Sequence, residues 1–225
     1  MKKLTVIFIL GTALICGGCQ IPGILGTPTR HEKKIPAEYD LTEHIEQKIL
    51  VLVEQPAYLN AQTNLRYYIT DAMNRDIVRR IKIEPEMLVD YSELSHLRSG
   101  RSHFAQLSKA EVGKALGADM VLYVDIDNYQ LRQMPDEGYL NGFLSGRALL
   151  LETATGEKLW PVDAKSKSIK VGFDVENRGK DIAVKRLAMA FAYCTVRYLY
   201  DCPESEFKLF DDRSGIQWQK WERKD

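Results

Sequence analysis

The step from a capped helix into an apolar strand at residues 108–126 constrains the fold most strongly. Ser108, followed three residues later by Glu111, matches a capping box, in which the hydroxyl and the carboxylate satisfy amides that the first helical turn leaves without partners. Gly117 supplies the left-handed conformation that ends a helix. The apolar run Met120–Ile126 then predicts a strand that is buried on both faces at first and alternates afterwards.

Three further segments on either side of this step show regular apolar patterns. Lys48–Val53 predicts a buried strand, and apolar residues at helical spacing predict an amphipathic helix at Thr63–Ile81. Met87–Tyr91 predicts a weaker strand between that helix and the next one. Lys180–Tyr200 is apolar around most of its circumference, so we expect a helix between the sheet and another element.

The second half of the chain is predicted to form antiparallel strands. The runs Phe143–Leu151 and Glu157–Val162 flank a short connection that contains Gly156, which predicts a β-hairpin, and Ser168–Val175 predicts a further strand. The expected order is β-α-β-α-β-β-β-α. This order predicts a single α/β domain with α+β character, in which helices pack on one mixed parallel and antiparallel sheet.

The N-terminus carries the features of a bacterial lipoprotein signal. Lys2 and Lys3 precede the apolar run Leu4–Ile15, whose helix would be about 18 Å long, too short for a hydrocarbon core of about 30 Å. Gly17-Gly18-Cys19 then resembles a lipobox, although Cys16 stands where Leu is usual. We expect cleavage after Gly18 and lipidation of Cys19. Ordinary cleavage and an uncleaved anchor remain the alternatives.

Four regions follow from these patterns: a signal peptide at 1–18, a lipidated N-terminus and flexible tether at 19–47, the domain at 48–202 and a C-terminal extension at 203–225. Two cysteines remain in the domain. If the last helix continued to about Tyr200, the Cα atoms of Cys194 and Cys202 would lie roughly 10 Å apart, beyond disulfide reach. A bridge would need the chain to fold back after Asp201, so the pairing stays open.

Composition and motifs name no cofactor. Lys and Arg together number 31, as do Asp and Glu, so there is no basic excess for nucleic acid. The four histidines lack the spacing that places two ligands on one helix face, so no metal site is expected. Glycine-rich phosphate loops and nucleophile elbows are also absent from the sequence. We therefore expect no catalytic residues and no enzymatic activity.

Two groups of residues keep functional alternatives open. Asp125 and Asp127 share one strand face about 7 Å apart, with Glu152 on a neighbouring strand, and paired carboxylates can hydrolyse glycosidic bonds. Solvent-facing acids near a strand end are the simpler interpretation. Trp218 and Trp221 lie three residues apart in the C-terminal extension. They fit docking on the domain, contact with a partner protein or contact with a membrane interface.

Two stretches carry a family resemblance. Leu116–Val124, with its Gly-Ala-Asp step into a strand, and the hairpin Ala148–Trp160 resemble the periplasmic domains of several bacterial envelope proteins. These are the penicillin-binding-protein activator lipoproteins, the curli-secretion-channel lipoprotein and the N-terminal domain of the Tol-system propeller protein. The resemblance implies a non-enzymatic module that binds another envelope protein or assembles with itself.

Together these patterns predict an outer-membrane lipoprotein. Gln20 replaces the Asp that retains lipoproteins in the inner membrane of enteric bacteria, which favours the outer membrane with the domain in the periplasm. The expected partners are the membrane, through the N-terminal acyl chains, and another envelope protein or a second copy of this chain. The alternatives are a structural subunit of an envelope secretion or assembly complex and, behind it, an envelope hydrolase.

Overall fold

The computed structural model describes residues 32–59, 64–134, 138–176 and 178–208. Residues from Lys34 onward belong to one unit, and the description below concerns that unit. The predicted cleavage position Gly18, the lipidation site Cys19 and the tryptophans Trp218 and Trp221 lie outside the described residues, so they stay predictions.

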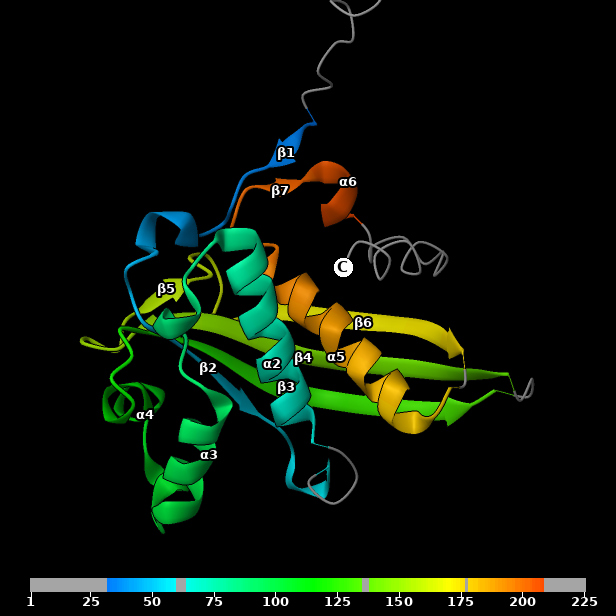
Figure 1. Cartoon of the computed structure of the whole chain (residues 1–225), viewed down its shortest axis with the longest axis horizontal. Coiled ribbons are helices and arrows are strands. Elements are labelled where there is room, and N and C mark those ends of the chain that lie inside the picture. Colours follow the sequence, from blue (N-terminus) through cyan, green and yellow to red (C-terminus); the bar gives the residue numbers. More distant parts are fainter. Residues whose placement is uncertain (1–31, 60–63, 135–137, 177, 209–225) are drawn as a thin grey trace, which may run out of the picture. The chain divides into compact units, whose positions relative to one another are not determined.

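A mixed five-stranded sheet forms the centre of the fold, as the sequence predicts (Figure 1). Its one parallel pair joins β2 to β3 over six residue pairs. β3 pairs antiparallel with β4, and β4 pairs antiparallel with both β5 and β6. The strands are β2 (Ile49–Glu54), β3 (Met120–Gln133), β4 (Tyr139–Glu152), β5 (Lys158–Trp160) and β6 (Lys167–Glu176).

Helices cover both faces of β2. α2 (Leu65–Asp76), which continues as a π-helix at Ile77–Ile81, packs with α5 (Lys180–Val196) on one face. α3 (Tyr91–Gly100) and α4 (Lys109–Ala115) lie over the other face. Alternate β2 side chains point to opposite faces, so Ile49, Val51 and Val53 join the larger apolar core while Leu50 and Leu52 join a second cluster under α3 and α4.

The region between α2 and α4 differs from the prediction. The sequence predicts a strand at Met87–Tyr91, but only Leu88 bridges to Ile49, and the Val89 amide donates to the Ile49 carbonyl at 3.0 Å. The chain then enters α3, because the Asp90 side chain accepts a hydrogen bond from the Ser92 amide at 2.6 Å and caps the helix. Of the predicted strand, Met87 ends a 3-10 helix at Pro85–Met87 and Tyr91 begins α3, so only the single bridge at Leu88 remains.

The capped step that opened the sequence argument is confirmed. Ser108 and Glu111 form both hydrogen bonds of the capping box at the start of α4, and Gly117 has φ +65°. β3 extends seven residues beyond the predicted end at Ile126. A bulge between Ile126 and Asn128 shifts the alternation of side chains by one residue, so the apolar pattern does not reveal the rest of the strand. The predicted helix-to-strand step thus leads into a much longer hairpin than its pattern indicates.

The second hairpin and the last helix also agree with the sequence. Gly156 has φ +75° in the turn between β4 and β5, and β5 ends at Trp160, whose side chain is buried. Four strands, β3 to β6, lie between α4 and α5, whereas the predicted order has three strands there. Cys194 and Cys202 are both buried, with no disulfide between them.

The packed unit extends beyond 48–202 at both ends. β1 (Lys34–Ile35) pairs antiparallel with β7 (Cys202–Pro203), which leads into the short helix α6 (Glu204–Phe207). Leu41 is fully buried, and its amide donates to the Leu199 carbonyl at 3.0 Å. Residues 34–47 therefore pack against the domain rather than extending the tether. Among the helices described, none combines the length and apolarity needed to cross a membrane.

Candidate functional site

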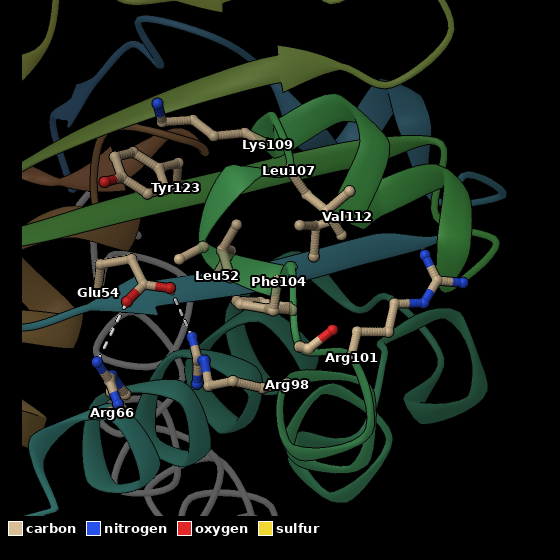
Figure 2. A pocket seen from close by; sticks show the side chains of 12 residues that line it. Leu52, Glu54, Arg66, Arg98, Arg101, Phe104, Leu107, Lys109, Val112 and Tyr123 are labelled. Carbon is tan, nitrogen blue, oxygen red and sulfur yellow. Dashed lines mark hydrogen bonds and ion pairs between the residues drawn. The ribbon is translucent and has the colours of Figure 1, made fainter.

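An open groove of about 570 Å³ lies beside the carboxyl end of β2, on the sheet face covered by α3 and α4 (Figure 2). It collects side chains from β2, β3, three helices and the loop between α3 and α4. We call it the basic groove. Its lining residues are Leu52, Glu54, Arg66, Arg98, Arg101, Ser102, Phe104, Ala105, Leu107, Lys109, Val112 and Tyr123.

The centre of the basic groove is apolar. Leu52 and Val112 belong to the second apolar cluster, where they are almost fully buried, and Leu107 and Phe104 pack against that cluster. Leu52 points to this side because alternate residues of β2 face opposite layers. Leu52 therefore lies beneath the groove, whereas the apolar surface open to solvent comes from the partly buried Phe104 and Leu107.

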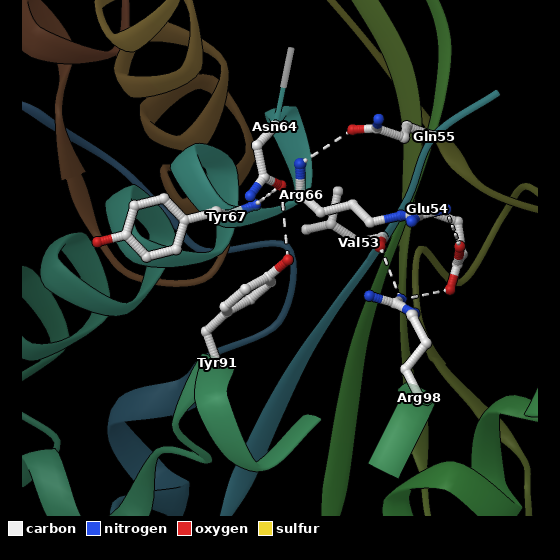
Figure 3. A network of polar contacts seen from close by, with 8 residues as sticks. All are labelled: Val53, Glu54, Gln55, Asn64, Arg66, Tyr67, Tyr91 and Arg98. Atoms are coloured by element: carbon white, nitrogen blue, oxygen red, sulfur yellow. Dashed lines mark hydrogen bonds and ion pairs between the residues drawn. The ribbon is translucent and has the colours of Figure 1, made fainter. Parts of the chain in front are cut away.

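Glu54, the last residue of β2, holds two arginines at one end of the groove (Figure 3). Its Oε2 lies 3.3 Å from Nη2 of Arg66, and its Oε1 lies 2.6 Å from Nη2 of Arg98. The Arg98 guanidinium also donates to the Val53 carbonyl at 3.3 Å. Two guanidinium groups therefore share a single negative charge.

Hydrogen bonds at the start of α2 and α3 fix where these arginines stand. Asn64 caps α2 by accepting from the Tyr67 amide at 3.3 Å, and the Gln55 side chain accepts from the Arg66 amide at 3.1 Å. The Tyr91 hydroxyl at the start of α3 donates to the Asn64 side chain at 3.5 Å, which links the two helix starts (Figure 3). Caps of this kind make the orientation of the first turn specific.

Further cations lie around the apolar centre. The Lys109 ammonium is 4.3 Å from the centroid of the Tyr123 ring, and the Arg98 guanidinium carbon is 5.0 Å from that of Phe104, both within cation–π range. Arg101 follows α3 and also lines the groove. With four cationic side chains against one carboxylate among the lining residues, the basic groove carries a net charge of +3.

Some donors in the groove lack an acceptor. Within the described residues, Nε of Arg66 is buried without a hydrogen-bond partner, and neither Arg101 nor Lys109 forms an ion pair with a carboxylate. Burial raises the pKa of Tyr123 to about 12, with smaller contributions from Asp125 and Glu54. The Tyr123 hydroxyl is therefore neutral at physiological pH and can donate. The arrangement is suited to binding an anion, because the accessible cations Arg101 and Lys109 have no carboxylate partner among the described residues.

The carboxylates proposed from the sequence do not form one site. Asp125 and Asp127 both bind Arg147, at 3.0 and 2.9 Å, which neutralises part of their charge. Glu152 pairs with Met120, whereas Asp125 pairs with Arg147, five residues further along β3. At about 3.4 Å per residue the two acids are roughly 17 Å apart along the sheet. The grouping of all three, on which the hydrolase hypothesis depends, is wrong.

In the part of the chain that the structure describes, no three side chains of His, Cys, Asp or Glu gather closely enough to hold a metal ion. The polar groups that line the basic groove are guanidinium, ammonium, phenol, hydroxyl and carboxylate groups.

No residue of the basic groove was predicted from the sequence to be functional. Glu54 directly follows the apolar run of β2, and an acid at the carboxyl end of a buried strand was an available signal, since ligands in open α/β sheets bind at those ends. Arg98 and Arg101 lie on and just after α3, the helix that was not predicted. The Asp90 cap with Glu93 three residues later was the signal for that helix.

Comparison with known proteins gives weak likenesses only. No family model and no curated protein matches the sequence. The fold resembles the lipoprotein GNA1162 from Neisseria meningitidis at 18% identity and a TM-score of 0.41, covering 64% of this chain and 94% of that one. It also resembles a PelC dodecamer subunit from Paraburkholderia phytofirmans at 10% identity and a TM-score of 0.41, covering 75% of this chain and 97% of that one.

A third likeness is to the C-terminal domain of LpoB from Salmonella enterica, at 14% identity and a TM-score of 0.33, covering 63% of this chain and 96% of that one. Bacterial lipoproteins are thus among the solved structures that this chain resembles. Because every one of these TM-scores lies below 0.5, the proposals below rest on the residues of this chain.

Proposed function

We propose that this chain is a lipid-anchored, non-enzymatic protein of the bacterial envelope whose periplasmic domain recruits another envelope protein through the basic groove. The observation that carries the proposal is the groove itself: an open apolar surface bordered by four cations and one carboxylate. Such a surface has donors and charge in excess of what its own chain satisfies. Electrostatic complementarity of this kind favours fast and selective association.

The anchor in this proposal is Cys19, exposed as the new N-terminus after cleavage behind Gly18. A single acyl chain holds a protein to a membrane only marginally, whereas the several chains of a bacterial lipoprotein hold it stably. Gln20 supports the outer membrane as the destination. Labelling with a radioactive fatty acid tests this part: the Cys19→Ser chain should lose the label, and retained label would contradict the anchor.

The position of the groove within the domain supports recruitment. β1 and β7 lie at one end of the domain and α3 and α4 at the other, with the sheet and α2 between them (Figure 1). The groove is bordered by α3 and α4, and Lys34, where the chain enters the domain, belongs to β1. Within the described domain, the strand through which the chain enters therefore lies away from the helices that border the groove.

Site-specific photo-crosslinking in intact cells tests recruitment. Ser102 and Ala105 line the groove without charge, so a photo-reactive amino acid at either position leaves its cations in place. We expect one discrete crosslinked protein from both positions. The same amino acid at Lys165, an exposed residue away from the groove, serves as the control. Equal crosslinking from Lys165, or none from the groove, would contradict recruitment at this surface.

A structural subunit of an envelope complex is the second candidate, and β6 favours it. Within the described strands β6 pairs only with β4, so its other edge is unpaired over ten residues. An unpaired edge can add a strand from a second chain. Mass measurement after detergent extraction distinguishes the candidates, since a closed oligomer fits a subunit and a monomer fits recruitment alone.

A further inference from the structure

The geometry points to an acidic peptide segment as the partner of the basic groove, with carboxylates on the bordering cations and an apolar side chain on the central surface. This inference rests on the proposed function and specifies its partner. Three features carry it: the charge that the groove leaves uncompensated, the separation of its cations, and the apolar area between them.

The positive charge that the groove leaves uncompensated favours an anionic ligand. Glu54 is already engaged by Arg66 and Arg98, at 3.3 and 2.6 Å, so no other carboxylate of the lining compensates Arg101 or Lys109. Arg101 is exposed and Lys109 partly exposed, so both are accessible to a ligand. Incoming oxyanions would form charged hydrogen bonds with these two cations.

The separation of the cations favours several carboxylates over one phosphate. In Figure 2 the Arg101 guanidinium is turned away from the other lining side chains, and the Lys109 ammonium lies on the Tyr123 side of the groove. Arg66 and Arg98 point to Glu54, so the four cations do not converge on one point. They belong to four segments: α4, the residue after α3, α2 and α3 itself. A single phosphate needs convergent donors, whereas acidic side chains along an extended peptide occur at intervals.

The apolar centre of the groove favours apolar residues between the acidic residues of the bound peptide. Leu52 and Val112 are almost fully buried, so the apolar surface that a ligand can reach comes from the partly buried side chains of Phe104 and Leu107. Phe104 also packs against the Arg98 guanidinium. A peptide with only acidic residues would leave this surface exposed, while an apolar side chain between two acids would cover it. The hydroxyl of Tyr123, neutral at physiological pH, adds a donor beside the Lys109 ammonium. The preferred segment therefore alternates acidic and apolar residues.

Selection from a displayed library of random 12-residue peptides tests the inference. The bait is the full chain with its anchor in phosphatidylcholine nanodiscs. We expect selected peptides to be enriched in Asp and Glu beside apolar residues, with affinity that falls as salt rises. The double variant Arg101→Glu/Lys109→Glu should bind them at least about tenfold more weakly, because charge reversal at an interface is strongly unfavourable.

Two matched variants separate recognition from folding. Arg101→Lys/Lys109→Arg keeps both charges and should retain binding within about threefold. Lys165→Glu/Lys170→Glu makes the same change in net charge at exposed residues outside the groove and should bind like the wild type. Position 109 begins α4, where an acid is favourable, so the reversed variant should still fold, and circular dichroism checks this.

Three results would overturn the inference: no acidic enrichment, unchanged affinity in the reversed variant, or an equal loss in the Lys165→Glu/Lys170→Glu control. Short-chain phosphatidylglycerol is tested as a competitor of peptide binding. If it binds the groove more tightly than the peptides do, and if this binding depends on Arg101, the ligand is a lipid headgroup rather than an acidic peptide. If the peptide selection fails but Ser102 still crosslinks to one discrete protein, the acidic peptide is rejected as the partner and recruitment at the groove is retained. Failure of both experiments would reject the groove as the interface.

Discussion

Replacing Glu54 by Gln should affect stability and binding in opposite directions. Gln keeps the shape of the side chain but removes the charge that Arg66 and Arg98 share. The three side chains are 31, 22 and 18% exposed, so their ion pairs are partly screened by solvent. Charged hydrogen bonds contribute about 1.5–3 kcal/mol when buried, and exposed ion pairs about 0.2–1 kcal/mol. We expect a loss of about 1–2 kcal/mol in the free energy of unfolding.

Binding should change the other way. Without the carboxylate, the net charge of the basic groove rises from +3 to +4, and the two guanidinium groups become available to an incoming anion. Acidic peptides should therefore bind about threefold or more tightly, with a steeper dependence on salt. A residue that merely supports the fold would weaken both stability and binding.

Urea unfolding of the full chain, combined with titration of an acidic peptide, measures both effects. A double-mutant cycle with Arg98→Met isolates the coupling to Glu54, and Glu157→Gln, at an exposed acid outside the groove, controls for net charge. Unchanged stability with coupling within about 0.3 kcal/mol would refute the contribution of the ion pairs. Weaker peptide binding by the Gln variant would refute the placement of Glu54 as an internal counter-ion.

Three further predictions concern the fold that holds the groove. Burial raises the pKa of Asp76 although Arg80 and Arg79 oppose the shift, so the folded state binds the Asp76 proton more tightly than the unfolded state does. The free energy of unfolding should therefore fall as pH rises through the pKa of the folded state. Urea unfolding at several pH values should show that Asp76→Asn loses this dependence. A Cβ at Gly146 would lie 2.6 Å from a backbone oxygen, so Gly146→Ala should cost about 1–3 kcal/mol by calorimetry, unlike Gly100→Ala, which meets nothing within 4 Å. Asp90→Ala should cost about 1 kcal/mol and weaken peptide binding through α3, and unchanged binding would contradict that link.

The sequence predicted secondary structure most accurately where the signals from neighbouring residues agree with how deeply the segment is buried. Ser108, Glu111 and Gly117 specify the limits of α4 through backbone hydrogen bonds that involve close neighbours only. The β-branched run of β2 lies between two packed layers, so its uniform apolarity matched its environment. The far half of β3 was missed because the bulge at residue 127 interrupts the alternation on which strand prediction depends.

The basic groove could not be predicted in the same way. Glu54 and Arg98 are 44 residues apart, and their contact depends on how α3 packs beside β2. α3 itself is largely polar, with Leu94 as its one fully buried residue among those described, so it shows little helical periodicity. The strand pattern favoured Asp125 and Asp127 as site residues instead, but in the structure both bind Arg147. Local patterns identify elements, whereas this site arises from their assembly.

The pairing of β1 with β7 has a mechanical consequence for an anchored protein. A pulling force that enters at Lys34 meets first a ladder of only two residue pairs, and then the backbone hydrogen bonds of Glu38 and Leu41 to the segment after α5. Once released, Lys34–Leu41 would span at most about 25 Å when fully extended, which is longer than the same segment folded against the domain. The strands and helices that border the basic groove lie outside this segment, so tension could extend the reach of the domain before it disturbs the surface that holds the partner.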